Sequence, residues 1–284
     1  MMKLSKWLLL ATLVLSFSAY ADKSNLDDKL QIAAAEGNNT RISELLEQGA
    51  NINTASRFGK TPIMQAAEAG KSATIALLLS QGANVNTRTK SGSSALIFAA
   101  ENGFPEVTAM LVELGANIHD RTRTGWDAMM IAARDGHDNI VAQLLEFGAD
   151  VRASDHRGNG ALMYAIEGGH DEVVKTLFQY SKLVSPCLPN DQGVTPLMAA
   201  IDKRQDAIVD QLLPYSKNIS HQDKSGDTAL HRAVELANTD LVAKLLEHKA
   251  TIDIKNEDGK NALELAEDMK HADIVTLLKK TIKK

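Results

Sequence analysis

The stretch Gly59–Asn86, GKTPIMQAAEAGKSATIALLLSQGANVN, is repeated with variations through almost all of the chain that follows it. Its opening glycine recurs at intervals of 33 residues, with one interval of 35, as Gly92, Gly125, Gly158, Gly193, Gly226 and Gly259. A fixed period of this length is typical of stacked units and not of one closed globule. The sequence therefore predicts a solenoid.

The local chemistry of this stretch predicts a pair of antiparallel helices. Thr61-Pro62 starts the first helix, because the threonine hydroxyl accepts a free backbone N–H and proline suits the first helical position. Gly70 supplies the left-handed residue that ends this helix. The spacing of an apolar helix face then returns in Ile75, Leu78 and Leu79.

The repeat resembles the ankyrin repeat, whose pattern contains Thr-Pro-Leu-His, Ala-Ala, a glycine turn and a Leu-Leu, two residues, Gly-Ala-Asp/Asn ending. Good later copies are TPLMAA from Thr195 and TALHRA from Thr228. The resemblance implies an all-α solenoid of stacked helix pairs with short β-hairpin loops, here called fingers, and it implies binding of a protein partner.

One position departs from the family pattern. Only His231 keeps the histidine of Thr-Pro-Leu-His, and the other units carry Met64, Ile97, Met130, Met163 and Met198. A methionine stripe in register with a repeat predicts core packing, since methionine fills irregular gaps between helices. We expect this departure to change the hydrogen bonds that the histidine usually makes, and not to change the fold.

We predict a signal peptide over residues 1–21 and one ankyrin-repeat domain over residues 22–284. Lys3 and Lys6 precede an apolar run from Trp7 to Phe17, and Ala19-Tyr20-Ala21 is a small-x-small cleavage site. The mature chain would begin at Asp22, without an integral membrane segment. The short, bacterial style of the signal favours an exported bacterial protein in the periplasm, with full secretion second.

The expected repeat units run near residues 26–58 (N-terminal cap), 59–91, 92–124, 125–157, 158–192, 193–225, 226–258 and 259–284 (C-terminal cap). The pattern falters at Tyr180-Ser181-Lys182 and in the longer connection from Pro186 to Pro189. That connection is interpreted as a drifted loop or as a local bend or specific contact. Lys249 stands where a helix-ending glycine is expected.

Composition narrows the function classes. Without residues 1–21 the formal charge falls from −5 to −7, because two lysines are removed. An acidic chain is a poor general nucleic-acid binder. Cys187 is the single cysteine, so no intrachain disulfide can form. We expect a monomer.

No signature of an enzyme is found: the chain lacks a Gly-rich phosphate loop, His-Glu-x-x-His, paired cysteines and Gly-x-Ser-x-Gly. Its histidines are spread through the units and do not predict a metal cluster. We therefore expect no catalytic residues, no cofactor and no metal.

Charge placement indicates a binding surface. Of ten Lys or Arg residues between Asn51 and Gly160, eight lie in the predicted fingers: Arg57, Lys60, Arg88, Lys90, Arg121, Arg123, Arg152 and Arg157. Phe58 and Trp126 lie among them, and aromatic residues with arginine are typical of binding hot spots. Charged loops also serve solubility, which is the alternative interpretation.

In the ankyrin family the fingertips and the ends of the first helices line the concave face that binds partners. Carried over by motif position, the partner-binding candidates are Arg57, Phe58, Lys60, Glu68, Lys90, Glu101, Asn102, Arg123, Trp126, Arg134, Asp135, His156, Arg157, Asn159 and Glu167. We expect a protein partner with an acidic patch. The alternatives are an inhibitor or immunity protein that blocks a periplasmic enzyme or toxin, and a binder of an anionic envelope ligand.

Overall fold

The computed structural model describes residues 25–180, 184 and 186–283. The predicted signal peptide, its cleavage site and the predicted mature start at Asp22 lie outside the described residues. So do residues 181–183 and 185 of the irregular junction. The chain forms two compact units, of which the first ends at Arg123 and the second begins at Thr124.

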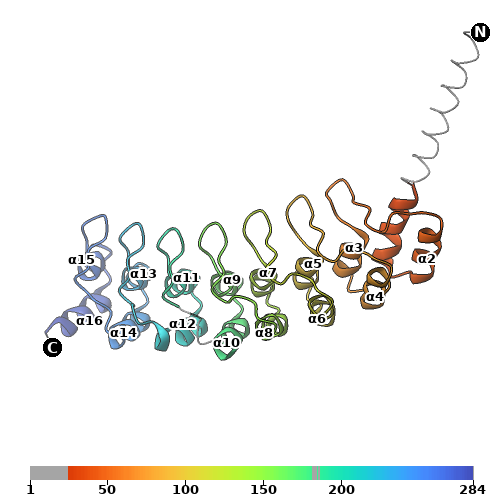
Figure 1. Cartoon of the computed structure of the whole chain (residues 1–284). Coiled ribbons are helices and arrows are strands. Elements are labelled where there is room, and N and C mark those ends of the chain that lie inside the picture. Colours follow the sequence, from red (N-terminus) through yellow and green to blue (C-terminus); the bar gives the residue numbers. More distant parts are fainter. Residues whose placement is uncertain (1–24, 181–183, 185, 284) are drawn as a thin grey trace, which may run out of the picture. The chain divides into compact units, whose positions relative to one another are not determined.

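Unit 1, described from residue 25 to Arg123, consists of helix pairs joined by fingers. Its helices are residues 25–36, α2 (Asn39–Glu47), α3 (Pro62–Glu68), α4 (Ser72–Ser80), α5 (Ala95–Glu101) and α6 (Pro105–Glu113). The pair formed by residues 25–36 and α2 is the predicted N-terminal cap. In Figure 1, α3 and α5 lie next to the fingers and α4 and α6 lie behind them.

Unit 2, from Thr124 onward, repeats this arrangement. Its helices are α7 (Ala128–Asp135), α8 (Asp138–Glu146), α9 (Ala161–Gly168), α10 (Asp171–Tyr180), α11 (Pro196–Asp202), α12 (Asp206–Leu212), the 3-10 turn η1 (Leu213–Tyr215), α13 (Ala229–Glu235), α14 (Thr239–Glu247), α15 (Ala262–Asp268) and α16 (Ala272–Ile282). The predicted all-α repeat fold is confirmed.

The helix starts follow the predicted backbone chemistry, and the predicted hydroxyl cap is found at Thr195 but not at Thr61. Thr61 has extended backbone and precedes α3, whose first residue is Pro62. Thr195 repeats the arrangement, and its hydroxyl accepts a hydrogen bond from the backbone N–H of Met198 at 3.3 Å. Pro105 likewise begins α6. Proline at these positions wastes no donor, because the first N–H groups of a helix have no partner within it.

The helix ends show where the sequence departs from its own pattern. Gly70 has a φ of +68°, the left-handed region that glycine enters without a steric penalty. The same turn in the last three repeats is made by Arg204, Ala237 and Lys270, with φ values of 56°, 53° and 62°. Lys249, where a glycine was expected, has a φ of 66°. The C-terminal repeats therefore carry backbone strain that the others avoid.

The core consists of small and branched apolar side chains between helices. Ala66, Ala67, Ile75 and Leu78 of the first full repeat are all completely buried. The methionine stripe is buried too, at 0% exposure for Met64 and Met130, 5% for Met163 and 1% for Met198. Core packing of these methionines is confirmed.

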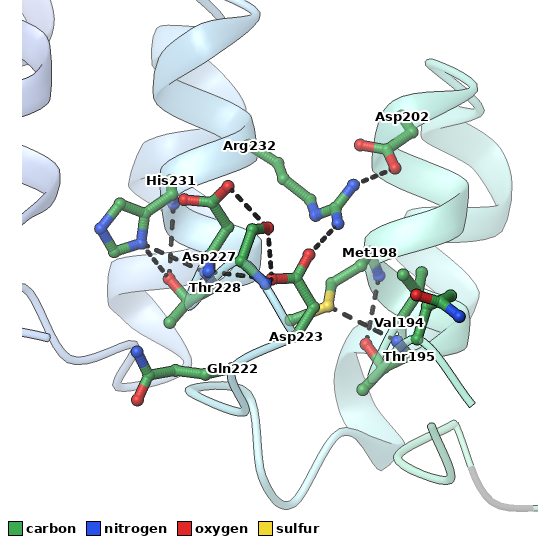
Figure 2. Close-up of polar contacts among 12 residues, drawn as sticks. Val194, Thr195, Met198, Asp202, Gln222, Asp223, Asp227, Thr228, His231 and Arg232 are labelled. Atoms are coloured by element: carbon green, nitrogen blue, oxygen red, sulfur yellow. Dashed lines mark hydrogen bonds and ion pairs between the residues drawn. The ribbon is translucent and has the colours of Figure 1, made fainter. Parts of the chain in front are cut away.

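Met64 and Met198 also take over half of the histidine's hydrogen bonding. His231 Nδ1 lies 3.2 Å from the backbone nitrogen of Thr228 (Figure 2). Its Nε2 lies 3.1 Å from the carbonyl oxygen of Lys260 in the next repeat. In the preceding repeat, Sδ of Met198 accepts the first bond, from Thr195, at 3.5 Å. A thioether has no donor, so it makes no bond of the second kind.

Gln31 restores the second bond in the N-terminal cap. It stands one period before Met64, and its Nε2 donates to the carbonyl oxygen of Lys60 at 3.0 Å. The sequence separation of 29 residues equals that of the His231 and Lys260 pair. The amide thus ties the cap to the next repeat as the histidine ties α13 to the finger that follows it.

Among the described residues no β-strand is present, and one isolated antiparallel bridge joins Ser154 and Gly160. The predicted β-hairpin loops are therefore tight turns and not paired strands. Their geometry is set by hydrogen bonds at the fingertips.

Candidate functional site

Each fingertip is a turn closed by its own backbone. In the first finger, the Gly59 N–H donates to the Ser56 carbonyl at 2.8 Å and the Ser56 N–H donates to the Lys60 carbonyl at 2.9 Å. The side chain at the start of the turn caps it, since Ser56 Oγ accepts from the Lys60 N–H at 3.1 Å. Thr89, Asp155, Asn190, Asp223 and Asn256 cap their own fingertips in the same way.

Backbone hydrogen bonds also join neighbouring fingertips. In unit 1, the Lys90 N–H donates to the Phe58 carbonyl at 2.9 Å and the Arg123 N–H donates to the Ser91 carbonyl at 2.7 Å. A Cβ on Gly59 would lie 3.0 Å from the Lys90 nitrogen, so the close approach also requires the glycine. The fingers of unit 1 are thus held in a row by main-chain hydrogen bonds.

A groove opens between the first two fingers of unit 1, and we call it the fingertip groove. It encloses about 450 Å³ and is lined by Ser56, Arg57, Phe58, Lys60, Gln65, Thr89, Ser91 and Phe98. Phe58 is 62% exposed, and the Arg57 guanidinium lies 4.5 Å from the centre of its ring.

Lys60 forms the inner end of the fingertip groove. Its Nζ lies 2.6 Å from Glu68 Oε2 at the end of α3 and 4.4 Å from the centre of the Phe98 ring on α5. The ammonium is therefore fixed between a carboxylate and an aromatic face, as cation–π geometry favours. Lys60 thus links its own finger to α3 of the same repeat and to α5 of the next repeat.

In unit 2 a second cluster forms around Trp126. Its ring lies 4.2 Å from that of Tyr164, and the Arg134 guanidinium lies 5.0 Å from the Trp126 ring. Arg134 also makes a bidentate pair with Asp135, with both N–O distances at 2.7 Å. Trp126 is half-buried against a core that includes Met130.

Asp155 anchors this cluster from the fingertip. Tyr164 donates its hydroxyl to Asp155 Oδ2 at 2.6 Å, and the backbone N–H groups of Arg157 and Asn159 both donate to Oδ1 at 2.8 Å. Burial raises the pKa of Asp155, but these hydrogen bonds and one with Trp126 outweigh it and hold the pKa below its usual value. Burial, followed by the bond to Asp155, raises the pKa of Tyr164.

A third cluster lies around Arg232 on α13 (Figure 2). Its guanidinium pairs with Asp202 at the end of α11 and with Asp223 at the tip of its own finger. Asp223 also accepts from the Ser225 hydroxyl at 2.7 Å and from the Asp227 N–H at 3.0 Å. Burial raises the pKa of Asp223, but the bonds from Ser225 and Arg232 prevail and lower it.

The sequence model of ankyrin repeats (3 copies) matches residues 30–122, 114–186, 129–223 and 197–284. The chain belongs to the ankyrin-repeat family. Ankyrin repeats generally mediate protein–protein interactions, and the family is typically a non-catalytic binding scaffold. A comparison with curated protein sequences gave no match.

In unit 1 of this ankyrin-repeat protein, the fingertip groove brings together three sequence-predicted residues, Arg57, Phe58 and Lys60, and Glu68 is joined to it by its ion pair with Lys60. The other four, Lys90, Glu101, Asn102 and Arg123, are exposed and do not line it. Asn102 Nδ2 donates to the Phe98 carbonyl at the end of α5.

In unit 2, the structure brings Trp126, Arg134 and Asp135 together, while His156, Arg157 and Glu167 are exposed around them. Asn159 is only 6% exposed, and its Oδ1 accepts from Asn190 Nδ2 at 3.0 Å. It offers the solvent very little surface, because the next finger covers it.

Sequence reasoning missed the fingertip pairs. Tyr164 reaches Asp155 and Arg232 reaches Asp223, in both cases across nine residues. The equivalent helix positions in unit 1 are Gln65 and Phe98, so no periodic signal marks the pairing. The recurring polar residue that starts each fingertip turn was the available signal.

At the irregular junction, Pro186 is buried and Leu188 is 57% exposed. The Cys187 thiol lies 3.9 Å from the Tyr215 carbonyl oxygen, and the Tyr215 ring stacks on Phe178 at 4.7 Å. These contacts join the connection to η1 and η1 to α10.

Among the described residues, no group of three or more His, Cys, Asp or Glu side chains is arranged to hold a metal ion. Within the same residues, no helix has the length and apolar character needed to cross a membrane.

Proposed function

We propose that this protein is an exported protein-binding module that recognises a partner protein, bearing an acidic patch, through the fingers and inner helices of its ankyrin repeats. The observation that carries the proposal is Phe58, a large apolar side chain 62% exposed at a fingertip beneath a stacked arginine. Exposed aromatic and arginine side chains together are typical of residues that dominate binding energy.

Preorganisation supports this function. The fingertip turns are closed by backbone hydrogen bonds and linked to their neighbours, so the fingers do not need to order when a partner arrives. Binding then loses less conformational entropy, and more of the contact energy appears as affinity.

The charge pattern supports an acidic partner. Arg57, Lys60, Arg88, Lys90, Arg121 and Arg123 lie in the fingers of unit 1, where the one acidic residue, Asp120, is 8% exposed. Such a surface raises the association rate with an acidic partner and makes it sensitive to salt.

Crosslinking capture from the periplasm of the source organism tests the proposal. The wild-type chain is compared with the double variant Arg57→Glu, Phe58→Ala, and with the matched double variant Arg41→Glu, Leu114→Ala. Leu114 is exposed and Arg41 is half-buried in the same unit, and both lie outside the groove. We expect a partner that the wild type and the matched variant capture and the groove variant loses.

Failure of the wild-type chain to capture any protein would overturn the proposed binding function. Loss of the captured protein's own activity on binding would assign an inhibitory role instead of a passive one. Export is tested separately by N-terminal sequencing of the chain from the periplasmic fraction. We expect the sequence to begin at Asp22, and an N-terminus at Met1 would contradict export.

A further inference from the structure

The fingertip groove has two aromatic walls that the repeat fold does not require. Phe58 stands at a fingertip where the other repeats carry Ser91, Thr124, Arg157, Gln192, Ser225 and Asp258. Phe98 comes from α5 of the next repeat and lines the opposite side of the groove. No structural role of the finger accounts for an exposed phenylalanine at this point.

The two cationic side chains of the groove, Lys60 and Arg57, differ in their contacts and exposure. Lys60 has its ammonium held by Glu68 at 2.6 Å, and its side chain is 20% exposed. Arg57 is exposed, and its guanidinium carbon lies 4.5 Å from the centre of the Phe58 ring, with no carboxylate among the described residues as its ion-pair partner. An arginine held in this way is suited to bind a carboxylate through two parallel hydrogen bonds.

From these features we infer that the fingertip groove of unit 1 binds an extended acidic peptide segment, with one aromatic or long aliphatic side chain between Phe58 and Phe98 and an adjacent carboxylate on Arg57. This inference rests on the proposed function and assigns the class of partner segment. The volume of about 450 Å³ suits one or two side chains and not a folded element.

The electrostatics favour a peptide over a nucleic acid, although bases also stack on aromatic rings. Glu68, whose side chain is 40% exposed, pairs with Lys60 beside the groove and so offsets the attraction of that lysine for phosphates that follow one another along a strand. A peptide needs a carboxylate only at Arg57 and can place its apolar side chain between Phe58 and Phe98. Lys90, exposed on the second fingertip, would attract a further carboxylate.

Fluorescence anisotropy with labelled dodecapeptides tests the inference. The parent peptide has a central phenylalanine flanked by two aspartates on each side. In one control peptide alanine replaces the phenylalanine, and in another asparagine replaces the aspartates. The chain is expressed from its complete coding sequence, and a thymidine oligonucleotide of twelve bases serves as the nucleic-acid probe.

We expect each peptide change to weaken binding about tenfold or more, which is the loss of one hot-spot contact. Phe58→Ala and Arg57→Gln in the protein should cause comparable losses. The matched variants Leu114→Ala and Arg41→Gln should bind within about twofold of the wild type. Because Phe58 and Arg57 are exposed, circular dichroism should show all four variants folded.

Equal binding of the parent and alanine peptides, or equal binding by Phe58→Ala, would overturn the inference. Tighter binding of the oligonucleotide than of the parent peptide would also overturn it. Absence of peptide binding by the wild type rejects the assigned segment class alone, because the proposed function is decided by capture of a whole protein from the periplasm.

Discussion

The sulfur of Met198 lies 3.5 Å from the backbone nitrogen of Thr195, in the place where a histidine nitrogen serves the following repeat. The thioether accepts the hydrogen bond from the backbone of its own repeat. It cannot make the hydrogen bond that the histidine donates to a carbonyl of the next repeat, because it has no donor. We therefore expect the free energy of unfolding to depend on whether histidine or methionine occupies this buried position in each repeat.

Met198→His and His231→Met should change the free energy of unfolding in opposite directions. Met198→His supplies an Nε2 donor to the carbonyl of Asp227, the equivalent of Lys260, and should stabilise by about 0.5–1.5 kcal/mol. His231→Met removes that bond and should destabilise by about 1–3 kcal/mol, because the Lys260 carbonyl loses a partner. Urea unfolding measures both, and changes of the same sign would contradict the equivalence.

Replacing the strained turn residue in α13's repeat should stabilise the protein. Ala237 has a φ of 53°, a conformation that costs an L-residue roughly 1–2 kcal/mol and glycine almost nothing. After the greater chain entropy of glycine is subtracted, Ala237→Gly should gain about 0.5–1 kcal/mol. Ala207→Gly, on the exposed face of α12, is the control and should lose about 1 kcal/mol. A loss in both variants would show that the turn is not strained.

Leu144 should be among the costly core truncations. It is completely buried on α8, and Leu144→Ala should destabilise by about 2–5 kcal/mol through lost burial and an unfilled cavity. The neighbouring Leu145 is half-buried, so Leu145→Ala should cost less. Thermal unfolding compares the two, and equal midpoints would mean that the helix faces are assigned wrongly.

Removal of Arg232 should destabilise the protein, because the buried carboxylate of Asp223 then loses its ion-pair partner. Asp223 has a side chain only 4% exposed, so Arg232→Met leaves a buried charge unpaired and should cost about 3–5 kcal/mol. The double variant Arg232→Met, Asp223→Asn removes that charge and should recover a large part of the loss. A double variant no more stable than the single one would reject this account.

Stability should fall in acid through Asp155 and Asp223. Both have folded pKa values below the ordinary value of 3.8, so each stabilises the fold fully above its unfolded pKa. That contribution is lost as pH falls below about 4 and through the folded pKa. Glu235 acts in the opposite sense, since burial raises its folded pKa above 4.5 and its ionisation weakens the fold.

The acid loss should be smaller in Asp155→Asn and Asp223→Asn than in the wild type. Urea unfolding between pH 3 and pH 7 measures the slope for each chain. Slopes identical to that of the wild type would mean that neither carboxylate carries the acid sensitivity.

The sequence predicted the parts of the fold that recur. Thr-Pro starts, glycine turns and alanine pairs are fixed by backbone geometry, so they return with the period and can be read from it. The burial of Trp126 could not be read in this way, because the ring that covers it, Tyr164, belongs to the next repeat and occupies a helix position that other repeats fill with Gln65, Phe98 and Ile131.

The candidate site was only partly predictable for the same reason. Arg57, Phe58 and Lys60 were found from their place in a finger, whereas Phe98 lies on a helix position that varies from Gln65 to Arg232. Its role depends on meeting the preceding finger in space. Such a contact between repeats depends on which two side chains occupy the facing positions, so the repeat pattern alone does not predict it.

The bond from the Lys90 N–H to the Phe58 carbonyl involves main-chain atoms alone. Any L-residue other than proline supplies that donor, and any residue supplies that acceptor. Mutation can therefore alter what the fingertips recognise while the row that holds them stays intact. A protein built in this way can change its target in evolution, or by directed selection in the laboratory, one surface side chain at a time and without first having to refold around the change.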